Sequence, residues 1–325
     1  MAKANLSEEL NRALEPVLAS PDAALPALSP HIAGLAGLAL ELRFLPRERF
    51  RVRLREELEW EAKMSEAAAT KPLRVGFHTI TPYIAVREAT ELIGFVKRAF
   101  GAEGGVLGIG SEGGIHAEMK IGDSMVMIGG GAALNRTPMP TALHYYVPDC
   151  DAVYRRAIEA GATSLMEPAD QFYGDREAAV KDVAGNHWYI ATHLNGPHIP
   201  PGLHSIQVSL HLHGASSLIE FLVKALGVEE ISRHPAPDGT IAHATLRLGS
   251  STFEMGAAHG PWQPMPTMFN LYVPDADALY CRALEAGAES VAEPADQPYG
   301  ARVAAVKDPA GNRWYFATPG KTMSH

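Results

Sequence analysis

The sequence predicts an α+β fold of two tandem domains. The stretch from Pro138 to Thr192 returns at Pro264 to Thr318, shifted by 126 positions without a gap. Within each copy, apolar patterns with the period of a strand alternate with patterns that have the period of a helix. Segments dense in Pro and Gly or in Ala interrupt both patterns. The chain therefore carries two copies of one folding unit.

The elements of the first copy follow from these patterns. In its first half we expect a strand at 78–86, a helix at 89–100, and strands at 105–109, 115–121 and 124–128. In its second half we expect a strand at 143–147, a helix at 150–160, and strands at 164–168, 177–182 and 187–192. Each copy thus comprises two βαβββ modules, and the chain comprises four.

Two linkers, at 66–72 and 195–202, set the predicted domain limits. They place the first domain at 72–196 and the second at 202–319. Residues 1–64 share no pattern with the copies and predict a helical N-terminal extension, with helices at about 8–18, 31–45 and 46–63. This extension either packs on the domains or joins two chains into a homodimer.

Composition narrows the class of partner. The chain has 325 residues, 46% of them hydrophobic, and a formal net charge of −9, which argues against nucleic-acid binding because phosphates require clustered Lys and Arg. Cys150 and Cys281 occupy non-equivalent places in the copies, so neither a disulfide nor a thiolate metal site is indicated. We find no apolar run of membrane-spanning length and no signal-peptide pattern, so we expect no membrane partner and a cytoplasmic location.

Three motifs recur in the second half of each copy. They are Val-Pro-Asp before a helix, Glu-Ala-Gly-Ala at its end, and Lys-Asp-x-Ala-Gly-Asn before the last strand. The sequence resembles the vicinal oxygen chelate superfamily, which includes glyoxalases, bleomycin resistance proteins and dioxygenases. The segments TPYIAV at 81–86, HAEMKIGDSMVMI at 116–128 and ADQFYGDR at 169–176 are similar to its PhnB-like branch. The resemblance implies glyoxalase-like domains, each with modules paired around a cleft.

The resemblance also implies where a metal would be bound, because active members use four strand residues, His, Glu or Gln, to hold Ni, Fe, Mn or Zn. The corresponding positions in copy one are Thr81, Met127, Ala142 and Tyr189. In copy two they are Gln207, Glu254, Met268 and Tyr315. Since a catalytic metal normally has three protein ligands, no metal cofactor is favoured. If one is bound, the candidates are Gln207, His211 and Glu254, and a rearranged site with His213 or His243 stays open.

Strand alternation indicates which side chains face the predicted clefts. His144 is the sharpest candidate in copy one, as a base or as a ligand for an anion, and its counterpart in copy two is Asn270. Tyr189 and Tyr315 suit either stacking on a flat ligand or a filled core. The full set of predicted cleft residues is Thr81, Tyr83, His144, Tyr146, Tyr189, Gln207, Ser209, His211, Glu254, Asn270 and Tyr315.

Three functions are compatible with this sequence. The first is binding of a small, partly aromatic organic molecule in the clefts without the usual metal. The second is a metal-dependent lyase, isomerase or dioxygenase with Glu254 and His211 in copy two. The third is an interaction protein that recruits a partner through residues 1–64. The sequence identifies no ligand, because one fold hosts many chemistries.

Overall fold

The computed structural model describes residues 74–109, 114–131, 134, 137–260 and 262–319. The helices predicted within 1–64 lie outside these residues. The structure therefore does not bear on the interaction function that depends on them. Among the described helices, none is both long and apolar enough to cross a membrane.

Copy one folds into the two modules that its patterns predict. Module one consists of β1 (Ile80–Val86), α4 (Ala89–Phe100), β2 (Glu103–Ile109), β3 (Ile115–Ile121) and β4 (Ser124–Gly130). Module two consists of β5 (Ala142–Tyr146), α5 (Cys150–Glu159), β6 (Thr163–Asp170), β7 (Asp175–Lys181) and β8 (His187–His193). The order of elements agrees with the expectation, and the ends differ by a few residues, as is usual for strand limits.

Copy two repeats the same order. Module three consists of β9 (Ile206–Leu212), α6 (Ala215–Leu226), β10 (Glu229–Pro235), β11 (Ile241–Leu248) and β12 (Ser251–Ala257). Module four consists of β13 (Met268–Tyr272), α7 (Ala276–Glu285), β14 (Glu289–Asp296), β15 (Ala301–Lys307) and β16 (Arg313–Pro319). Asp149 and Asp275, from the two Val-Pro-Asp motifs, cap α5 and α7 by accepting hydrogen bonds from Ala152 N and Ala278 N.

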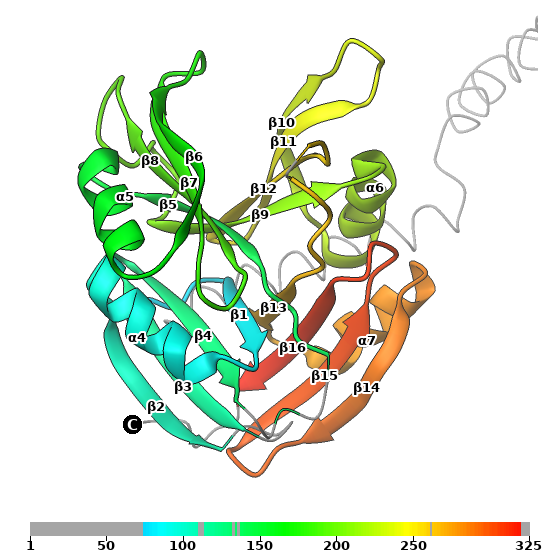
Figure 1. Cartoon of the computed structure of the whole chain (residues 1–325). Helices are drawn as coiled ribbons and strands as arrows, with labels where there is room; N and C mark the ends of the chain where they lie inside the picture. The colour runs from blue at the N-terminus through cyan, green and yellow to red at the C-terminus, as the bar shows by residue number, and fades with distance from the viewer. Residues whose placement is uncertain (1–73, 110–113, 132–133, 135–136, 261, 320–325) are drawn as a thin grey trace, which may run out of the picture. The chain divides into compact units, whose positions relative to one another are not determined.

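The two eight-stranded sheets combine modules from different copies (Figure 1). One sheet has the order β14-β15-β16-β13-β1-β4-β3-β2, so it joins module four to module one. The other has the order β10-β11-β12-β9-β5-β8-β7-β6 and joins module three to module two. The expectation that each copy pairs its own modules around its own cleft is therefore corrected.

The physical reason lies in the edges of the modules. Each module leaves its first strand unpaired on one side, and an apolar edge strand must be covered or paired. β1 pairs antiparallel with β13, and β5 pairs antiparallel with β9. Equivalent modules of the two copies present equivalent edges, so local patterns do not decide which two edges meet.

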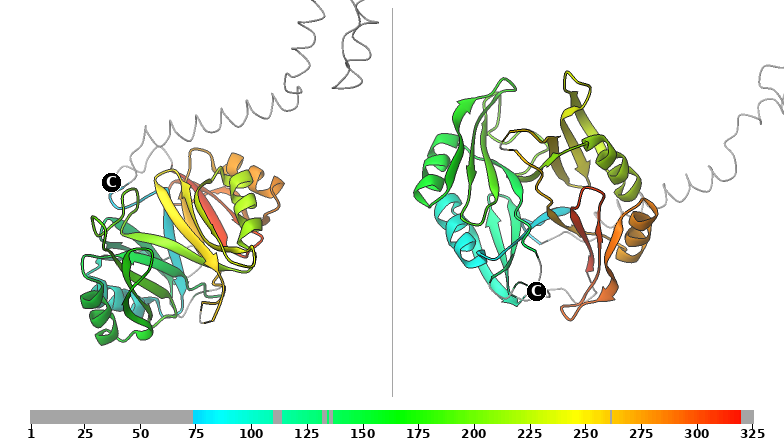
Figure 2. Two further views of the ribbon diagram at one scale, coloured as in Figure 1. Left: turned by 90° about the horizontal axis from the view of Figure 1, so that it is seen from above. Right: turned by 45° about the vertical axis from the view of Figure 1, so that its right-hand side comes forward.

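The helices connect the modules within a copy. The α4 and α5 helices lie side by side in both views (Figures 1 and 2), and Arg156 Nε donates a hydrogen bond to the Ala99 carbonyl at 3.1 Å. The α6 and α7 helices make the equivalent contact, where Arg282 Nε donates to the Lys224 carbonyl at 2.8 Å. Sheets thus join the copies, while helices join the halves of each copy.

A buried aspartate holds the final strand of each copy. The Asp182 carboxylate accepts hydrogen bonds from Ala184 N, from Asn186 N and Nδ2, and from the indole nitrogen of Trp188. Asp308 makes the same four bonds with Ala310, Asn312 and Trp314. Both tryptophans are fully buried. The Lys-Asp-x-Ala-Gly-Asn motif therefore encodes a structural network.

Candidate functional site

A cavity of about 550 Å³ lies between modules one and four, and we call it the aromatic cavity. Four tyrosines contribute to its wall, namely Tyr83, Tyr272, Tyr299 and Tyr315. Apolar groups complete much of the lining, among them Leu107, Ile109, Met127, Met268 and Val303. A volume of this size, lined by aromatic and apolar groups, suits a small organic molecule.

Few polar groups reach the aromatic cavity. The Arg74 guanidinium donates two hydrogen bonds to the Glu118 carboxylate, at 3.0 and 2.6 Å, and the Tyr83 hydroxyl lies 3.3 Å from His116 Nδ1. Asn270 Nδ2 is buried and has no hydrogen-bond partner among the described residues. A buried amide N–H without an acceptor is costly, so this donor favours a ligand with an oxygen acceptor.

The charges at the rim of the cavity are paired. Burial alone raises the pKa of Glu118, but the hydrogen bonds from His116 and Arg74 outweigh it and hold the pKa below its usual value. Burial raises the pKa of Tyr272 despite the nearby Arg74 cation. Glu118 is therefore an anion and Tyr272 a neutral phenol at pH 7, so the cavity carries little net charge.

Modules two and three enclose a different set of side chains, which we call the charged cluster: His144, Glu177 and Glu254. His144 is only 6% exposed, and its imidazole lies between the two carboxylates. Its Nδ1 lies 3.1 Å from Glu254 Oε2, within a hydrogen bond. Its Nε2 lies 3.5 Å from Glu177 Oε2, at ion-pair distance but without a hydrogen bond.

The cluster fixes the protonation of its members. Burial alone lowers the pKa of His144, but the adjacent Glu254 and Glu177 carboxylates outweigh it and raise the pKa to about 9. Burial alone raises the pKa of Glu254, but the His144 cation holds it well below its usual range. Burial dominates at Glu177, whose pKa is raised. At neutral pH the core of the cluster is thus an imidazolium–carboxylate pair.

An outer layer of hydrogen bonds surrounds the charged cluster. The Tyr173 hydroxyl donates to Glu177 Oε2 at 3.1 Å. The Tyr146 hydroxyl, whose ring stacks on His144 at 4.5 Å between centroids, donates to Asp175 Oδ2 at 3.0 Å. His193 Nδ1 contacts Asp175 Oδ1 at 2.7 Å. Each carboxylate therefore has a partner that orients it.

The cavity and the cluster occupy equivalent places in the two sheets, since Tyr83 pairs with Met127 as Ser209 pairs with Glu254. Every member of the charged cluster is replaced in the aromatic cavity. The counterparts of His144, Glu177 and Glu254 are Asn270, Val303 and Met127, and those of Asp175 and His193 are Ala301 and Pro319. These five differences between the copies separate a charged site from a largely apolar one.

The predicted cleft residues divide between these two places. Tyr83, Asn270 and Tyr315 line the aromatic cavity. His144 and Glu254 form the core of the charged cluster, with Tyr146 beside them. The cleft predicted within copy one is therefore split, because its two modules belong to different sheets.

The other predicted residues serve different contacts. The Tyr189 hydroxyl lies 3.2 Å from His211 Nε2, and both rings pack near Trp262. Burial lowers the pKa of His211 to about 4. The Thr81 hydroxyl donates to the His78 carbonyl. Ser209 is half-buried beside Glu254 in the register of β9 and β12.

Several residues of these sites were not predicted from the sequence. They are Arg74 and Glu118 at the cavity and Glu177, Asp175, Tyr173 and His193 at the cluster. A comparison of the copies carried a signal for three of them, because Asp175, Glu177 and His193 align with Ala301, Val303 and Pro319. A charge in only one copy marks a site that diverged.

Comparisons with known proteins identify the family. The model of the Glyoxalase/Bleomycin resistance protein/Dioxygenase superfamily matches residues 215–316. An uncharacterized protein of Mycobacterium bovis, Mb0911c, is 37% identical over 116 residues, which cover 32% of this chain and 76% of that protein. The chain belongs to the glyoxalase/bleomycin resistance protein/dioxygenase superfamily.

Two further similarities extend beyond one copy. CFP32 from Mycobacterium bovis is 26% identical over 204 residues, covering 58% of this chain and 77% of CFP32. The crystal structure of glyoxalase I from Zea mays has a TM-score of 0.57 at 15% identity and covers 74% of this chain and 92% of that one. This chain and the maize protein therefore share a fold over 74% of this chain, which is more than one copy comprises.

The positions that hold a metal in active members of the superfamily do not converge on a metal site here. Both ends of the Gln207 side-chain amide are already hydrogen-bonded, since its Nε2 donates to the His204 carbonyl and its Oε1 accepts from Thr252. His211 contacts Tyr189, whereas Glu254 contacts His144. In the described part of the chain, a group of three His, Cys, Asp or Glu ligand atoms that is compact enough for a metal occurs elsewhere, at His78, Asp123 and His204. The donor set Gln207, His211 and Glu254 therefore does not fit the metal that the superfamily implies.

Proposed function

We propose that this chain is a glyoxalase/bleomycin-resistance-like protein that binds a small, partly aromatic organic molecule in the aromatic cavity, without the usual metal. The observation that carries the proposal is the 550 Å³ cavity with its four tyrosines. Aromatic walls stack on flat ligands, and a few placed polar groups fix the orientation of a ligand.

The buried Asn270 amide indicates a second property that the ligand should have. Its Nδ2 lines the cavity and needs an acceptor. A carbonyl, carboxylate or ether oxygen on the ligand supplies one. The charged cluster is a poorer place for such a molecule, because a flat apolar ligand does not compensate the cost of desolvating an imidazolium and its carboxylates.

We also propose that the chain belongs to the PhnB-like branch. The segment ADQFYGDR supports this assignment. In the structure the arginine of this segment forms ion pairs within the fold. Arg176 pairs with Asp151 and with Asp170, and Arg302 pairs with Asp277 and Asp296 in copy two. The same arrangement in both copies indicates that these arginines stabilise the turn of this segment.

Coumarin and 1-naphthoate are suitable probes of the aromatic cavity, because both are flat, aromatic and carry oxygen acceptors. We expect at least one of them to bind with one molecule per chain and to raise the melting temperature. Replacing Met127 with tryptophan fills the cavity wall, so this variant should bind at least tenfold more weakly. Isothermal titration calorimetry and fluorescence titration measure both affinities.

The matched control is Ser209→Tyr, which places at the charged cluster the residue that the cavity has at the equivalent position, Tyr83. This variant should bind the probe within twofold of the parent chain. Equal affinity of Met127→Trp and the parent would place the probe outside the cavity and contradict the proposal, as would the failure of both probes to bind stoichiometrically.

A further inference from the structure

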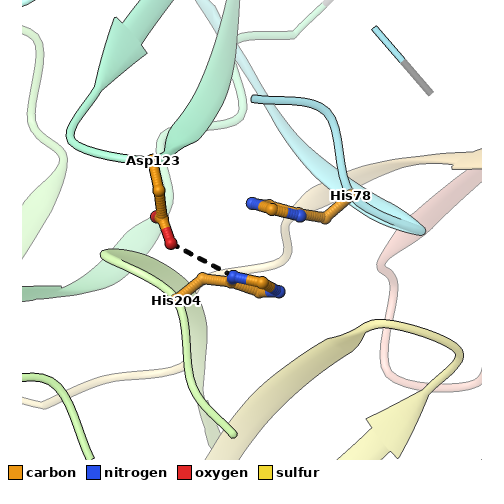
Figure 3. A group of neighbouring side chains, drawn as sticks. All are labelled: His78, Asp123 and His204. Atoms are coloured by element: carbon orange, nitrogen blue, oxygen red, sulfur yellow. Dashed lines mark hydrogen bonds and ion pairs between the residues drawn. The ribbon is translucent and has the colours of Figure 1, made fainter. Parts of the chain in front are cut away.

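His78, Asp123 and His204 lie together where the two copies meet (Figure 3). None of them lines the aromatic cavity or belongs to the charged cluster. His78 precedes β1, His204 precedes β9, and Asp123 lies in the turn between β3 and β4. The two histidines occupy equivalent positions, 126 residues apart. One ligand-type atom from each residue lies within 4.8 Å of the others.

Neighbouring groups orient the Asp123 carboxylate. Its Oδ1 accepts hydrogen bonds from Ser124 Oγ and from Ser205 N, both at 2.7 Å. Its Oδ2 is thereby directed at His204 Nδ1, which is 3.2 Å away. Hydrogen bonds that fix one oxygen of a carboxylate and leave the other free are typical of the outer shell of metal sites.

His204 is oriented in the same manner. Its Nε2 lies 2.8 Å from the Ser250 carbonyl, which can only accept, so Nε2 carries a proton. The nitrogen that remains for a metal is Nδ1, beside Asp123. A histidine that donates its other N–H to a backbone carbonyl is the usual arrangement of a metal-binding imidazole.

His78 supplies the third donor. Its Nε2 is buried and has no hydrogen-bond partner among the described residues, and in Figure 3 its ring extends towards Asp123. A buried imidazole nitrogen without a hydrogen-bond partner is available to a metal.

We infer that His78, Asp123 and His204 form a binding site for one divalent transition metal, of the zinc type, that links the two copies of the chain. Two imidazoles and a carboxylate suit zinc, and three protein ligands leave one position for water. In a tetrahedral zinc site neighbouring ligand atoms are about 3.3 Å apart, close to the 3.2 Å between Asp123 Oδ2 and His204 Nδ1.

Two changes accompany binding. The imidazole rings are stacked, with centroids 3.5 Å apart and planes inclined by 14°, so one ring has to rotate until both lone pairs converge on the ion. His204 Nδ1 also gives up the proton that it shares with Asp123, because a metal ligand must be deprotonated. The ion takes the place of this proton between the carboxylate and the two imidazoles.

The equivalent place on the other side of the junction lacks a carboxylate. There Ser250 occupies the position of Asp123, and its hydroxyl accepts a hydrogen bond from Thr79 N at 3.1 Å. A serine is thus compatible with this turn. The variant Asp123→Ser removes the metal's anionic ligand while reproducing a residue that the fold already uses in copy two.

The test is calorimetric titration of the full chain, cleared of metal with a chelator, with zinc chloride. We expect one zinc ion per chain and a higher melting temperature with zinc. Both effects should be lost, with affinity reduced at least 100-fold, in Asp123→Ser and in His78→Ala. The variant Glu254→Gln, at a metal position of the superfamily, should bind zinc as the parent does.

Cobalt(II) provides a readout that does not depend on stability. A visible absorption band for a cobalt ion bound in the parent chain should be absent from Asp123→Ser. Failure of the parent to bind zinc at 100 μM would overturn the inference. So would unchanged binding by Asp123→Ser and His78→Ala, or a loss of zinc binding in Glu254→Gln.

Discussion

Replacing Asp182 with alanine should lower the free energy of unfolding by about 4 kcal/mol, because it leaves several buried donors without an acceptor. The indole nitrogen of Trp188 and the side-chain amide of Asn186 both lose the Oδ2 atom, at 2.8 and 2.9 Å. Two backbone N–H groups lose Oδ1 as well. Urea denaturation followed by circular dichroism measures the change.

Two variants control this prediction. Asp308→Ala removes the same network from copy two and should cost a similar amount. Glu159→Ala removes an exposed carboxylate at the end of α5 and should change stability by less than about 0.5 kcal/mol. A loss below about 1 kcal/mol for Asp182→Ala would show that the network does not hold the final strand.

The second large effect concerns pH. The folded-state pKa of His144, about 9, lies above the ordinary value of 6.5. The ion pair with Glu254 therefore contributes its full stabilisation below pH 6.5 and loses it as the pH rises through 9. A pKa difference of this size corresponds to roughly 3 kcal/mol. Unfolding measured in urea at pH 6, 7.5 and 9 should show this decline.

Variants built from the other copy test whether His144 is the cause. His144→Asn introduces the residue found at the equivalent position, Asn270, but leaves Glu177 and Glu254 without their cation, so it should be strongly destabilised at neutral pH. The triple variant His144→Asn/Glu177→Val/Glu254→Met reproduces the apolar set of the aromatic cavity. It should recover stability and lose the decline between pH 6.5 and 9. An unchanged decline in the triple variant would assign the effect to another group.

The sequence predicted the modules because their signals are local. Strand and helix periods, the Asp149 and Asp275 caps, and the repeated motifs each depend on neighbouring residues. The pairing of modules depends on which equivalent edges meet, and no local pattern distinguishes β5 from β13 as the partner of β1. That choice decides which residues share a cavity.

The predicted cleft residues lie at two places. Tyr83, Asn270 and Tyr315 lie at one and His144 and Glu254 at the other, whereas strand alternation alone grouped them by copy. Glu177 was missed because the comparison of the copies marks it only as a difference from Val303, and its local sequence Glu-Ala-Ala-Val gives no sign that it faces His144 across the sheet. His78, Asp123 and His204 were missed because they lie in short connections, and only the junction of the copies brings them together.

The exchange of modules between the copies has an evolutionary consequence. Sheets that join module one to module four and module two to module three are what a symmetric homodimer of two-module chains would form. In such a dimer both interfacial sites are identical, because one gene encodes both. In a single chain each site can change alone. The two sites differ at three pairs of equivalent positions, Met127 and Glu254, Asn270 and His144, and Val303 and Glu177, so they no longer share their chemistry.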